Sequence, residues 1–185
     1  FLLIFFFILF GHILNVSRFS KRKDHTTTLR AFKIVKDKLD NVKLILIGYG
    51  PELQKVKSLA KELKLIKDII IINKTHNPYP YMKKSDLLIL TSVYEGFPNV
   101  LVESLTIGTP VISTNANAGA SEIVLNGKGG DLIKLGDYKD LAKKIINHFN
   151  SPSKLQMKTK IAKNNLFRFE TKRHSKIYTN LFKKI

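Results

Sequence analysis

The chain of 185 residues is 44% hydrophobic and 25% charged, a composition typical of one folded domain and not of a disordered segment. It contains no cysteine, which excludes disulfides, thiol nucleophiles and thiolate metal sites. Its 32 Lys and Arg outnumber its 14 Asp and Glu, for a net charge of +18. This charge is compatible with a solvated lysine surface, with attraction to an anionic membrane surface, or with nucleic-acid binding.

Nucleic acid is the least favoured of these partners. The excess charge comes from lysine, because arginine occurs only at positions 18, 22, 30, 168 and 173. Basic residues are not interleaved with aromatic ones as in RNA-binding modules, and there is no zinc-finger spacing. A basic nucleic-acid-binding module therefore remains only a minor alternative.

Residues 1–12 form an atypical hydrophobic segment. The apolar run that starts with "FLLIFFFILF" ends at Leu14, short of the ~20 residues that span a bilayer. No basic residue precedes it, and the chain starts at Phe1 and not at Met, which is unlike a signal peptide. We interpret this segment as a non-native or truncated start; the alternative is a membrane anchor that begins upstream.

From residue 13 onward, short apolar strands alternate with amphipathic helices. Strands are expected at 13–16, 42–48, 68–72, 86–90, 110–113 and near 132, with a Pro-rich loop at 74–82. Helices are expected at 26–39, 51–63, 99–108, 121–125 and 141–149, and the basic tail 151–185 is helical in pattern and is expected to pack on the domain 13–150. Strands that are apolar on both faces need cover on both sides. The fold class is therefore α/β, a Rossmann-like doubly wound parallel sheet.

Ligands of such sheets bind beyond the carboxyl ends of the strands, so the loops that follow the strands are the candidate site. The loop 17–24 carries Arg18, Lys21, Arg22 and Lys23 just before a helix. Helix N-termini attract anions and cations add charge-assisted hydrogen bonds, so this loop suits a phosphate group. A basic surface loop in a basic protein is the alternative.

Two further loops carry weaker signals. Gly48 and Gly50 stand at a strand-to-helix turn without the third glycine of the dinucleotide fingerprint. They predict only a tight turn or a close approach of the backbone to another group. Metal-dependent chemistry is not expected, because there is no Asp-x-Asp pair and the histidines have no ligand spacing. Ser/His/Asp catalysis lacks the Gly-x-Ser-x-Gly turn.

The stretch "YEGFPNVLVE" places Glu95 in a loop and Glu103 on the helix that begins near Pro98. The free N–H groups of the first helical turn can hold a pyrophosphate, and carboxylates accept hydrogen bonds from hydroxyl groups. Together they suggest a sugar nucleotide. By spacing alone, the alternative remains that Glu95 is a capping acid and Glu103 a solvated helix residue.

Four blocks in order, "SRFSKRKDH", "LILIGYGPEL", "NPYPYMKKSDLLILTSVYEGFPNVLVESLTIGTPVIST" and "GASEIV", resemble the C-terminal half of retaining GT-B glycosyltransferases. The family is family four, the glycosyl transferases group 1 domain, and the resemblance covers about residues 13–146. Glu95 and Glu103 form its Glu-x7-Glu pattern. The "NPYPYM" block resembles members that build lipopolysaccharide-type surface polysaccharides and lipid-linked oligosaccharides. Ser17 stands where the family usually has glycine.

The resemblance implies a domain over residues 13–150 that binds a nucleotide sugar, such as a UDP-sugar, without a metal. Catalytic roles fall on Arg18 and Lys23, which hold the diphosphate, and on Glu95, which contacts the transferred hexose. The implied donor-binding residues are Gly96, Phe97, Asn99, Val100, Leu101, Glu103 on the ribose, Gly48, Gly50, and His76 in the loop beside the base. The acceptor would be a glycan or a lipid-linked sugar.

The resemblance also sets expectations for the acceptor-binding half, the activity and the location of the protein. The family's N-terminal acceptor half is expected to be missing here or supplied as a separate chain, so that this chain alone lacks turnover. A cytoplasmic location follows, with peripheral contact at the inner face of the cytoplasmic membrane. The alternative is a catalytically inactive fragment of a split gene that at most binds nucleotide.

Overall fold

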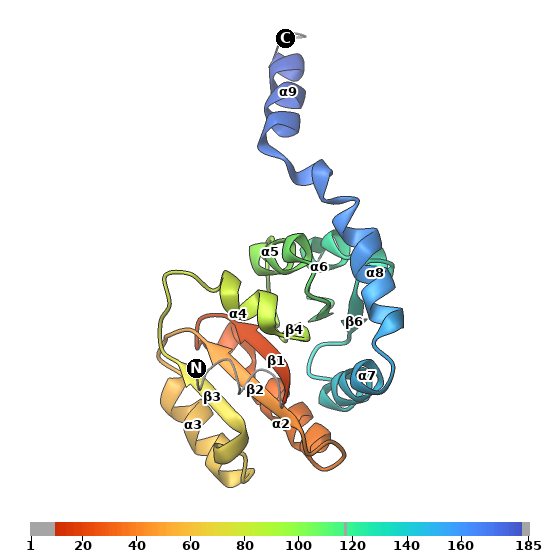
Figure 1. The fold of residues 1–185 in the computed structure, drawn as a ribbon. Helices are drawn as coiled ribbons and strands as arrows, with labels where there is room; N and C mark the ends of the chain where they lie inside the picture. Colours follow the sequence, from red (N-terminus) through yellow and green to blue (C-terminus); the bar gives the residue numbers. More distant parts are fainter. Residues whose placement is uncertain (1–9, 117, 183–185) are drawn as a thin grey trace.

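The computed structural model describes residues 10–116 and 118–182 (Figure 1). Its centre is a six-stranded sheet in which every neighbouring pair of strands is parallel, in the order β3-β2-β1-β4-β5-β6. The strands are β1 Gly11–Val16, β2 Val42–Ile47, β3 Ile69–Ile72, β4 Leu87–Leu90, β5 Val111–Thr114 and β6 Asp131–Ile133. The predicted fold class, a doubly wound Rossmann-like sheet, is confirmed.

Helices connect the strands and cover both faces of the sheet. They are α2 His25–Lys36, α3 Leu53–Glu62, α4 Tyr79–Lys84, α5 Asn99–Ile107, α6 Ala118–Ile123, α7 Tyr138–Asn150, α8 Ser153–Lys163 and α9 Thr171–Phe182. Short 3-10 helices are η1 Lys21–Lys23, η2 Ile66–Asp68, η3 Leu125–Gly127 and η4 Leu166–Phe169. No helix within 10–116 and 118–182 is both long and apolar enough to cross a bilayer.

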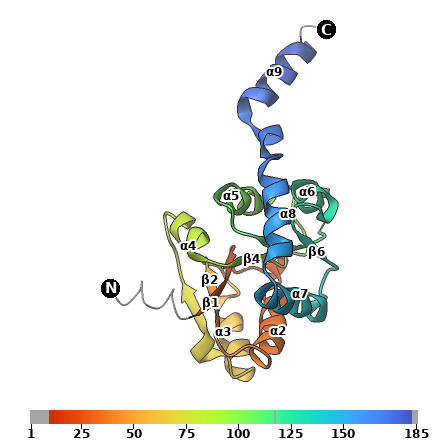
Figure 2. The same cartoon turned by 45° about the vertical axis from the view of Figure 1, so that its right-hand side comes forward.

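The core has two layers, one on each face of the sheet. Ile13 and Leu44 pack with α2, α3 and α7 on one face, whereas their neighbours Leu14 and Ile45 pack with α4, α5 and α6 on the other. Figures 1 and 2 show these two helical layers on opposite sides of the strands. Because successive strand side chains point to opposite faces, burial on both sides explains why the strands are apolar without interruption.

Residues at helix ends fix where α2 begins and where α5 ends. Asp24 is the N-cap of α2, and its side chain accepts a hydrogen bond from the backbone N–H of Thr27. Gly108 ends α5 in a left-handed conformation with a φ of 97°. These two residues bound the helices that were expected at 26–39 and 99–108.

The Pro-rich loop expected at 74–82 ends earlier than predicted. Helix α4 begins at Tyr79, with Pro78 as its N-cap and Pro80 in its first turn. Proline is tolerated there because the first N–H groups of a helix have no intrahelical partner to lose. Met82 of this helix is fully buried against the sheet. The loop after β3 therefore runs only from residue 73 to 78.

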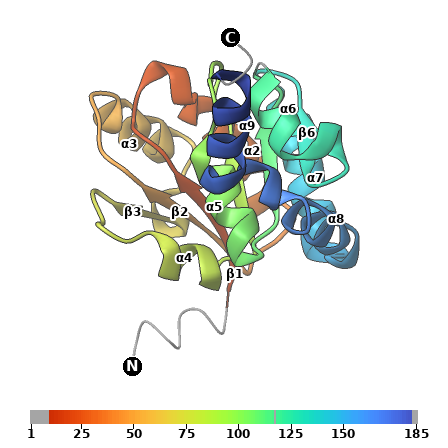
Figure 3. The same ribbon diagram turned by 90° about the horizontal axis from the view of Figure 1, so that it is seen from above.

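The two helices of the C-terminal segment, α8 and α9, lie differently with respect to the domain. Helix α8 packs on the domain through buried Leu155, Thr159 and Ala162. Helix α9 instead extends away from the body, and its described side chains are exposed (Figures 1 and 2). Seen from above, it rises from the side that α5 covers (Figure 3). The packing expected of the whole tail thus stops at η4, and the proposed boundaries at residues 12 and 150 stay predictions.

Candidate functional site

The candidate site lies where the strand order reverses, between β1 and β4. Because both strands are parallel neighbours, the loops that follow them leave the same edge of the sheet side by side. The backbone N–H of Val93 donates to the carbonyl of Arg22 over 2.8 Å, which joins the two loops directly. The basic loop 17–24 and the acidic loop 91–98 therefore form one surface.

Lys23 and Glu95 are joined across this junction. They form an ion pair and hydrogen bond between the Lys23 ammonium and Glu95 Oε1, with 19% and 14% of the two side chains exposed. Ser92 Oγ donates to the same Glu95 oxygen over 2.6 Å. Among the described residues the other oxygen, Oε2, accepts no hydrogen bond. The pair thus leaves one carboxylate oxygen free for a hydroxyl group.

Buried threonines fix the position of the Lys23 loop below this pair. The Thr91 hydroxyl lies 3.0 Å from the carbonyl oxygens of Lys23 and Asp24, and 2.8 Å from the Thr28 hydroxyl. Carbonyl oxygens only accept, so the single Thr91 proton goes to them and Thr28 donates to Thr91. Both hydroxyls are buried, which makes this chain of hydrogen bonds costly to break.

Arg18 stands on the same loop between two anchored neighbours. Phe19 is fully buried and its backbone N–H donates to the Tyr49 carbonyl over 2.9 Å, while the N–H of Ser17 donates to Ile47. Arg18 itself is exposed, and its guanidinium has no partner among residues 10–116 and 118–182. The anchored backbone therefore presents a free cation at the edge of the sheet, close along the chain to Lys23.

Gly48 and Gly50 allow this arrangement. A Cβ atom on Gly48 would lie 1.9 Å from the Ser17 carbonyl oxygen, and one on Gly50 would lie 2.3 Å from that of Phe19. These contacts are shorter than any real side chain tolerates. The close approach that the sequence indicated is to the Arg18 loop, and a direct donor contact of either glycine stays a prediction.

A buried polar chain under the site was not foreseen from the sequence. Asn15 Nδ2 donates to the Ile89 carbonyl over 3.0 Å, Ser17 Oγ donates to Asn15 Oδ1 over 2.7 Å, and His25 Nε2 lies 3.3 Å from Ser17 Oγ. Because Ser17 gives its only proton to Asn15, His25 Nε2–H must be the donor to Ser17. The signals were an asparagine inside an apolar strand and the serine at the family's glycine position.

His25 is neutral in this setting. It is 4% exposed and stacks near the Phe19 ring, with centroids 4.7 Å apart. Burial, and then the charge of Lys23, lower the pKa of His25 from 6.5 to about 4. Its Nδ1 is buried without a partner among the described residues. A proton on this ring would therefore be poorly solvated and would face another cation.

The first turn of α5 supplies backbone donors beside Glu95. Gly96, Phe97 and Asn99 are exposed, Val100 is half-buried, and the N–H groups at the start of the helix have no carbonyl one turn earlier. Leu101 is fully buried, so its side chain anchors the helix, and its N–H is the exception among these donors because it already donates to the Pro98 carbonyl over 2.9 Å. This placement agrees with an anion-binding helix start, and the individual roles stay predictions.

Glu103 and His76 lie apart from the Lys23–Glu95 pair. Glu103, farther along α5, is half-buried without a partner among the described residues, and burial raises its pKa. His76 is exposed in the loop after β3, the edge strand of the sheet, where Thr75 and Asn77 bond to each other and Asn77 also accepts the Tyr79 N–H at the start of α4. The fold brings neither residue into direct contact with the pair, and their donor-binding roles stay predictions.

The C-terminal segment braces the acidic loop. The rings of Phe97 and Phe169 meet edge to face with centroids 5.0 Å apart. Beside Phe169, Arg168 Nη2 donates to the carbonyl of Glu122 over 2.5 Å at the end of α6. A Cβ atom on Gly119 would lie 2.1 Å from the Gly96 carbonyl oxygen, so α6 also touches this loop. Sequence reasoning did not anticipate this support.

The model of the family described as "Glycosyl transferases group 1" matches residues 11–165 of this chain. The chain belongs to this family. Within 10–116 and 118–182, no three His, Asp or Glu side chains gather closely enough to hold a metal ion. Metal-independent binding by this group 1 domain stays a prediction.

Two similar curated proteins are also named as glycosyltransferases. The chain is 31% identical over 166 residues to the capsular polysaccharide biosynthesis glycosyltransferase CapM of Staphylococcus aureus, covering 88% of this chain and 42% of CapM. It is 34% identical over 129 residues to the N-acetylgalactosamine-N,N'-diacetylbacillosaminyl-diphospho-undecaprenol 4-alpha-N-acetylgalactosaminyltransferase of Campylobacter jejuni, covering 70% and 34%. The chain spans 27% to 42% of the length of the first curated relatives it matches.

The fold has counterparts among solved structures. The structure of HepE from Anabaena in complex with UDP and glucose superposes with a TM-score of 0.87 at 23% identity, covering 98% of this chain and 50% of HepE. Staphylococcus aureus TarM superposes with a TM-score of 0.87 at 22% identity, covering 94% of this chain and 35% of TarM. These likenesses show that the group 1 domain has the fold of one half of a GT-B enzyme.

The contact between Gly48 and the Arg18 loop can be tested by substitution. Gly48→Ala is expected to lower the free energy of unfolding by about 3 kcal/mol or more, because the new Cβ would overlap the Ser17 carbonyl. Gly136→Ala is the matched control, since Gly136 has a positive φ of 71° but open space around it, and should cost about 1 kcal/mol. Equal losses in urea denaturation would contradict the proposed close contact.

The buried His25 predicts a pH dependence of stability. Its pKa in the folded chain, about 4, is below its unfolded value of 6.5, so its contribution is complete above pH 6.5 and is lost as the pH falls toward 4. His25→Gln, which keeps a donor for Ser17 without titrating, should remove about 2 kcal/mol of the decline in unfolding free energy between roughly pH 7.5 and 5. His12 and His148 also have lowered pKa values, so only the difference between the two proteins is diagnostic. Parallel pH profiles would contradict the assignment.

Proposed function

We propose that this chain binds the nucleotide-sugar donor of a retaining glycosyltransferase, with a UDP-sugar as the donor. The observation that carries the proposal is the Lys23–Glu95 pair at the strand-order reversal, next to the free N–H groups at the start of α5. A cation, helix N–H groups and a carboxylate together match a ligand that has phosphates at one end and hydroxyls at the other.

The phosphate side of the proposed donor site is cationic. Arg18 and Lys23 would bind the diphosphate, with the N–H groups around Gly96 and Phe97 completing the cradle. As the bond from sugar to phosphate breaks, negative charge grows on the leaving diphosphate, and fixed cations and N–H dipoles stabilise that charge. In this proposal they do so without a bound metal.

The sugar side of the proposed donor site is formed by carboxylate groups. Glu95 Oε1 already accepts from Lys23 and Ser92, which orients the group and leaves Oε2 for a hydroxyl of the transferred hexose. Glu103 would accept from the ribose hydroxyls, and its raised pKa reflects the burial that such hydrogen bonds would offset. His76, Gly48 and Gly50 would lie around the base and the far side of the nucleotide.

The acceptor and the location are further parts of the proposal. The names of the relatives mention capsular polysaccharide and a diphospho-undecaprenol carrier, which supports a glycan or lipid-linked acceptor for this chain. A lipid-linked acceptor would place the protein in the cytoplasm at the inner face of the membrane. The net charge of +18 would favour peripheral contact with an anionic surface there.

Donor binding is tested by titrating UDP into the chain by calorimetry, with and without EDTA. Arg18→Ala should weaken UDP binding about tenfold, the cost of one charge-assisted hydrogen bond. Lys23→Ala should weaken it more, because Glu95 would then face the diphosphate unpaired. The double variant Lys23→Ala/Glu95→Gln should recover part of that loss by removing the repulsion.

The control is Lys38→Ala, an exposed lysine after α2 at the opposite edge of the sheet. It changes the net charge equally and should leave UDP affinity within about twofold. Unchanged binding in both Arg18→Ala and Lys23→Ala would overturn the donor site. Loss of binding in EDTA would overturn the metal-independent part alone.

We further propose that the 185-residue chain by itself binds the donor without transferring the sugar. It spans less than half of the curated relatives named above, and orienting an acceptor can supply several kcal/mol of a reaction barrier. Incubation with radiolabelled UDP-sugars and lipid-linked or glycan acceptors should give no labelled product. Product above the level of a Glu95→Gln control would show that the chain is an enzyme on its own.

A further inference from the structure

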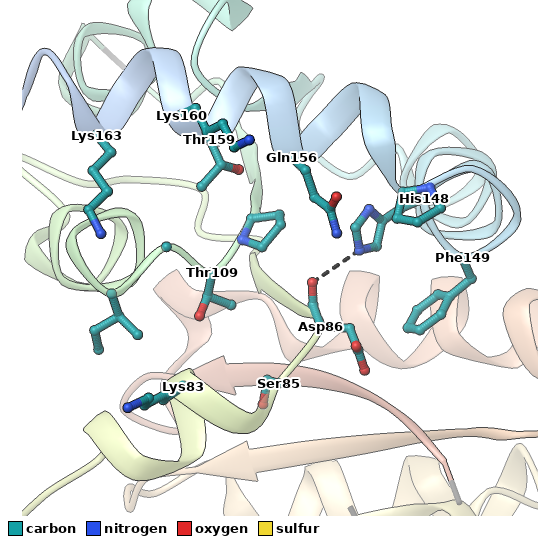
Figure 4. Close-up of a pocket in the computed structure, with 14 residues that line it drawn as sticks. Lys83, Ser85, Asp86, Thr109, His148, Phe149, Gln156, Thr159, Lys160 and Lys163 are labelled. Atoms are coloured by element: carbon teal, nitrogen blue, oxygen red, sulfur yellow. Dashed lines mark hydrogen bonds between the residues drawn. The ribbon is translucent and has the colours of Figure 1, made fainter. Parts of the chain in front are cut away.

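A second cavity lies at the opposite edge of the sheet from the candidate donor site. It has a volume of about 640 Å³ and is bordered by Asp86 and Pro110, the residues just before β4 and β5. Figure 4 shows α8 forming one wall and the end of α4 another. Since the donor loops follow the carboxyl ends of the strands, the length of the sheet separates the two places.

Lysines from two helices surround this cavity. Lys83 comes from α4, and Lys160 and Lys163 come from α8 (Figure 4). All are exposed, and none has an ion-pair or hydrogen-bond partner among residues 10–116 and 118–182. The carboxylate in the lining, Asp86, already accepts the backbone N–H of His12 at Oδ2 over 2.7 Å. A neutral N–H does not cancel the charge of that carboxylate, so the lining has three lysines against one acid and keeps an excess of positive charge.

The floor of the cavity is held in place by His148. This residue is 5% exposed, and its Nε2 lies 3.0 Å from the Asp86 carbonyl oxygen, an atom that only accepts (Figure 4). Nε2 must then carry the proton, which fixes the ring orientation. Gln156 of α8 also lines the cavity and offers an uncharged N–H donor (Figure 4). Neutral polar side chains and lysine side chains thus line the same cavity.

An alternative explanation is that the lysines only compensate the ends of helices. Lys83 is in the last turn of α4, and Lys160 and Lys163 are both in the last turn of α8, where cations interact favourably with the helix dipole. That effect needs no ligand, and it falls off within one turn. It accounts for each lysine on its own helix but predicts no ligand in the cavity that all three line, so the two explanations predict different binding.

We propose that this cavity binds a phosphate-bearing anion, a phosphomonoester or a diphosphate, through Lys83, Lys160 and Lys163. Ammonium groups on flexible stems suit phosphate as point charges. The phosphate can come from a dissolved compound or from a lipid headgroup. Exposed Met157 and Ile161, one turn apart on α8, lie next to the lysine-bearing face and would meet the lipid in the second case.

The first experiment measures binding of inorganic pyrophosphate by calorimetry in the presence of saturating UDP, which keeps the donor site occupied. Lys83→Ala/Lys160→Ala/Lys163→Ala should bind pyrophosphate at least about tenfold more weakly than the unaltered chain. The matched control is Lys57→Ala/Lys61→Ala/Lys154→Ala, which removes the same charge from exposed positions outside this cavity. It should change the affinity by no more than about twofold.

Equal losses in the two triple variants would reduce the effect to overall charge and overturn the site. Absence of measurable pyrophosphate and vesicle binding by the unaltered chain would overturn it as well. Unchanged UDP affinity and unfolding midpoint in the cavity variant show that the donor site and the fold are intact. Failure of the cavity proposal is thereby separated from failure of the proposed function.

The second experiment distinguishes the two sources of phosphate by sedimentation with phosphatidylcholine vesicles, with and without phosphatidic acid. If the lipid is the source, the chain sediments only with the anionic vesicles, pyrophosphate releases it, and the cavity variant stays in solution. Met157→Ser/Ile161→Ser should then lose vesicle binding but keep pyrophosphate binding. If the source is a dissolved compound, pyrophosphate binds and the vesicles retain no more of the unaltered chain than of the cavity variant.

Discussion

The ion pair between Lys23 and Glu95 is the contact on which the candidate site depends. It joins two loops that are 72 residues apart and holds both at the edge where β1 and β4 leave the sheet. The pair exists because the strand order reverses at this point, so that the two loops have no helix between them. A carboxylate held by a fixed cation keeps one orientation, and its oxygens accept hydrogen bonds from hydroxyl groups.

Polar residues at the strand ends make this junction rigid. Asn15, Ser17 and His25 form one largely buried chain at the start of the basic loop, and Thr28 and Thr91 form another that holds the carbonyls of Lys23 and Asp24. Buried polar groups are expensive when unpaired, so each chain favours a single arrangement of the loop above it. The site is thus organised before any ligand arrives, which lowers the free-energy cost of binding.

The two edges of the sheet differ in their residues and in how their cations are held. At the carboxyl edge, glycines let backbones touch, backbone hydrogen bonds hold the residues on either side of Arg18, and Lys23 is paired with a carboxylate. At the amino edge, the lysines around the cavity are unpaired among the described residues and α8 supplies one wall. In a chain with 32 Lys and Arg against 14 Asp and Glu, most cations have no acid to pair with, and Lys23 is paired across the junction of the two loops.

The sequence by itself determined the fold class, the order of the elements and the loops that carry the candidate site. These follow from local patterns: apolar strands, a capping Asp24, a closing Gly108, and the rule that parallel strands present their following loops at one edge. Only the tertiary structure decided that Lys23 pairs with Glu95, that Gly48 contacts the Arg18 loop, and that Phe169 supports Phe97. Such contacts join distant segments through shape and burial, which no local pattern encodes, and for the same reason the outward course of α9 was missed.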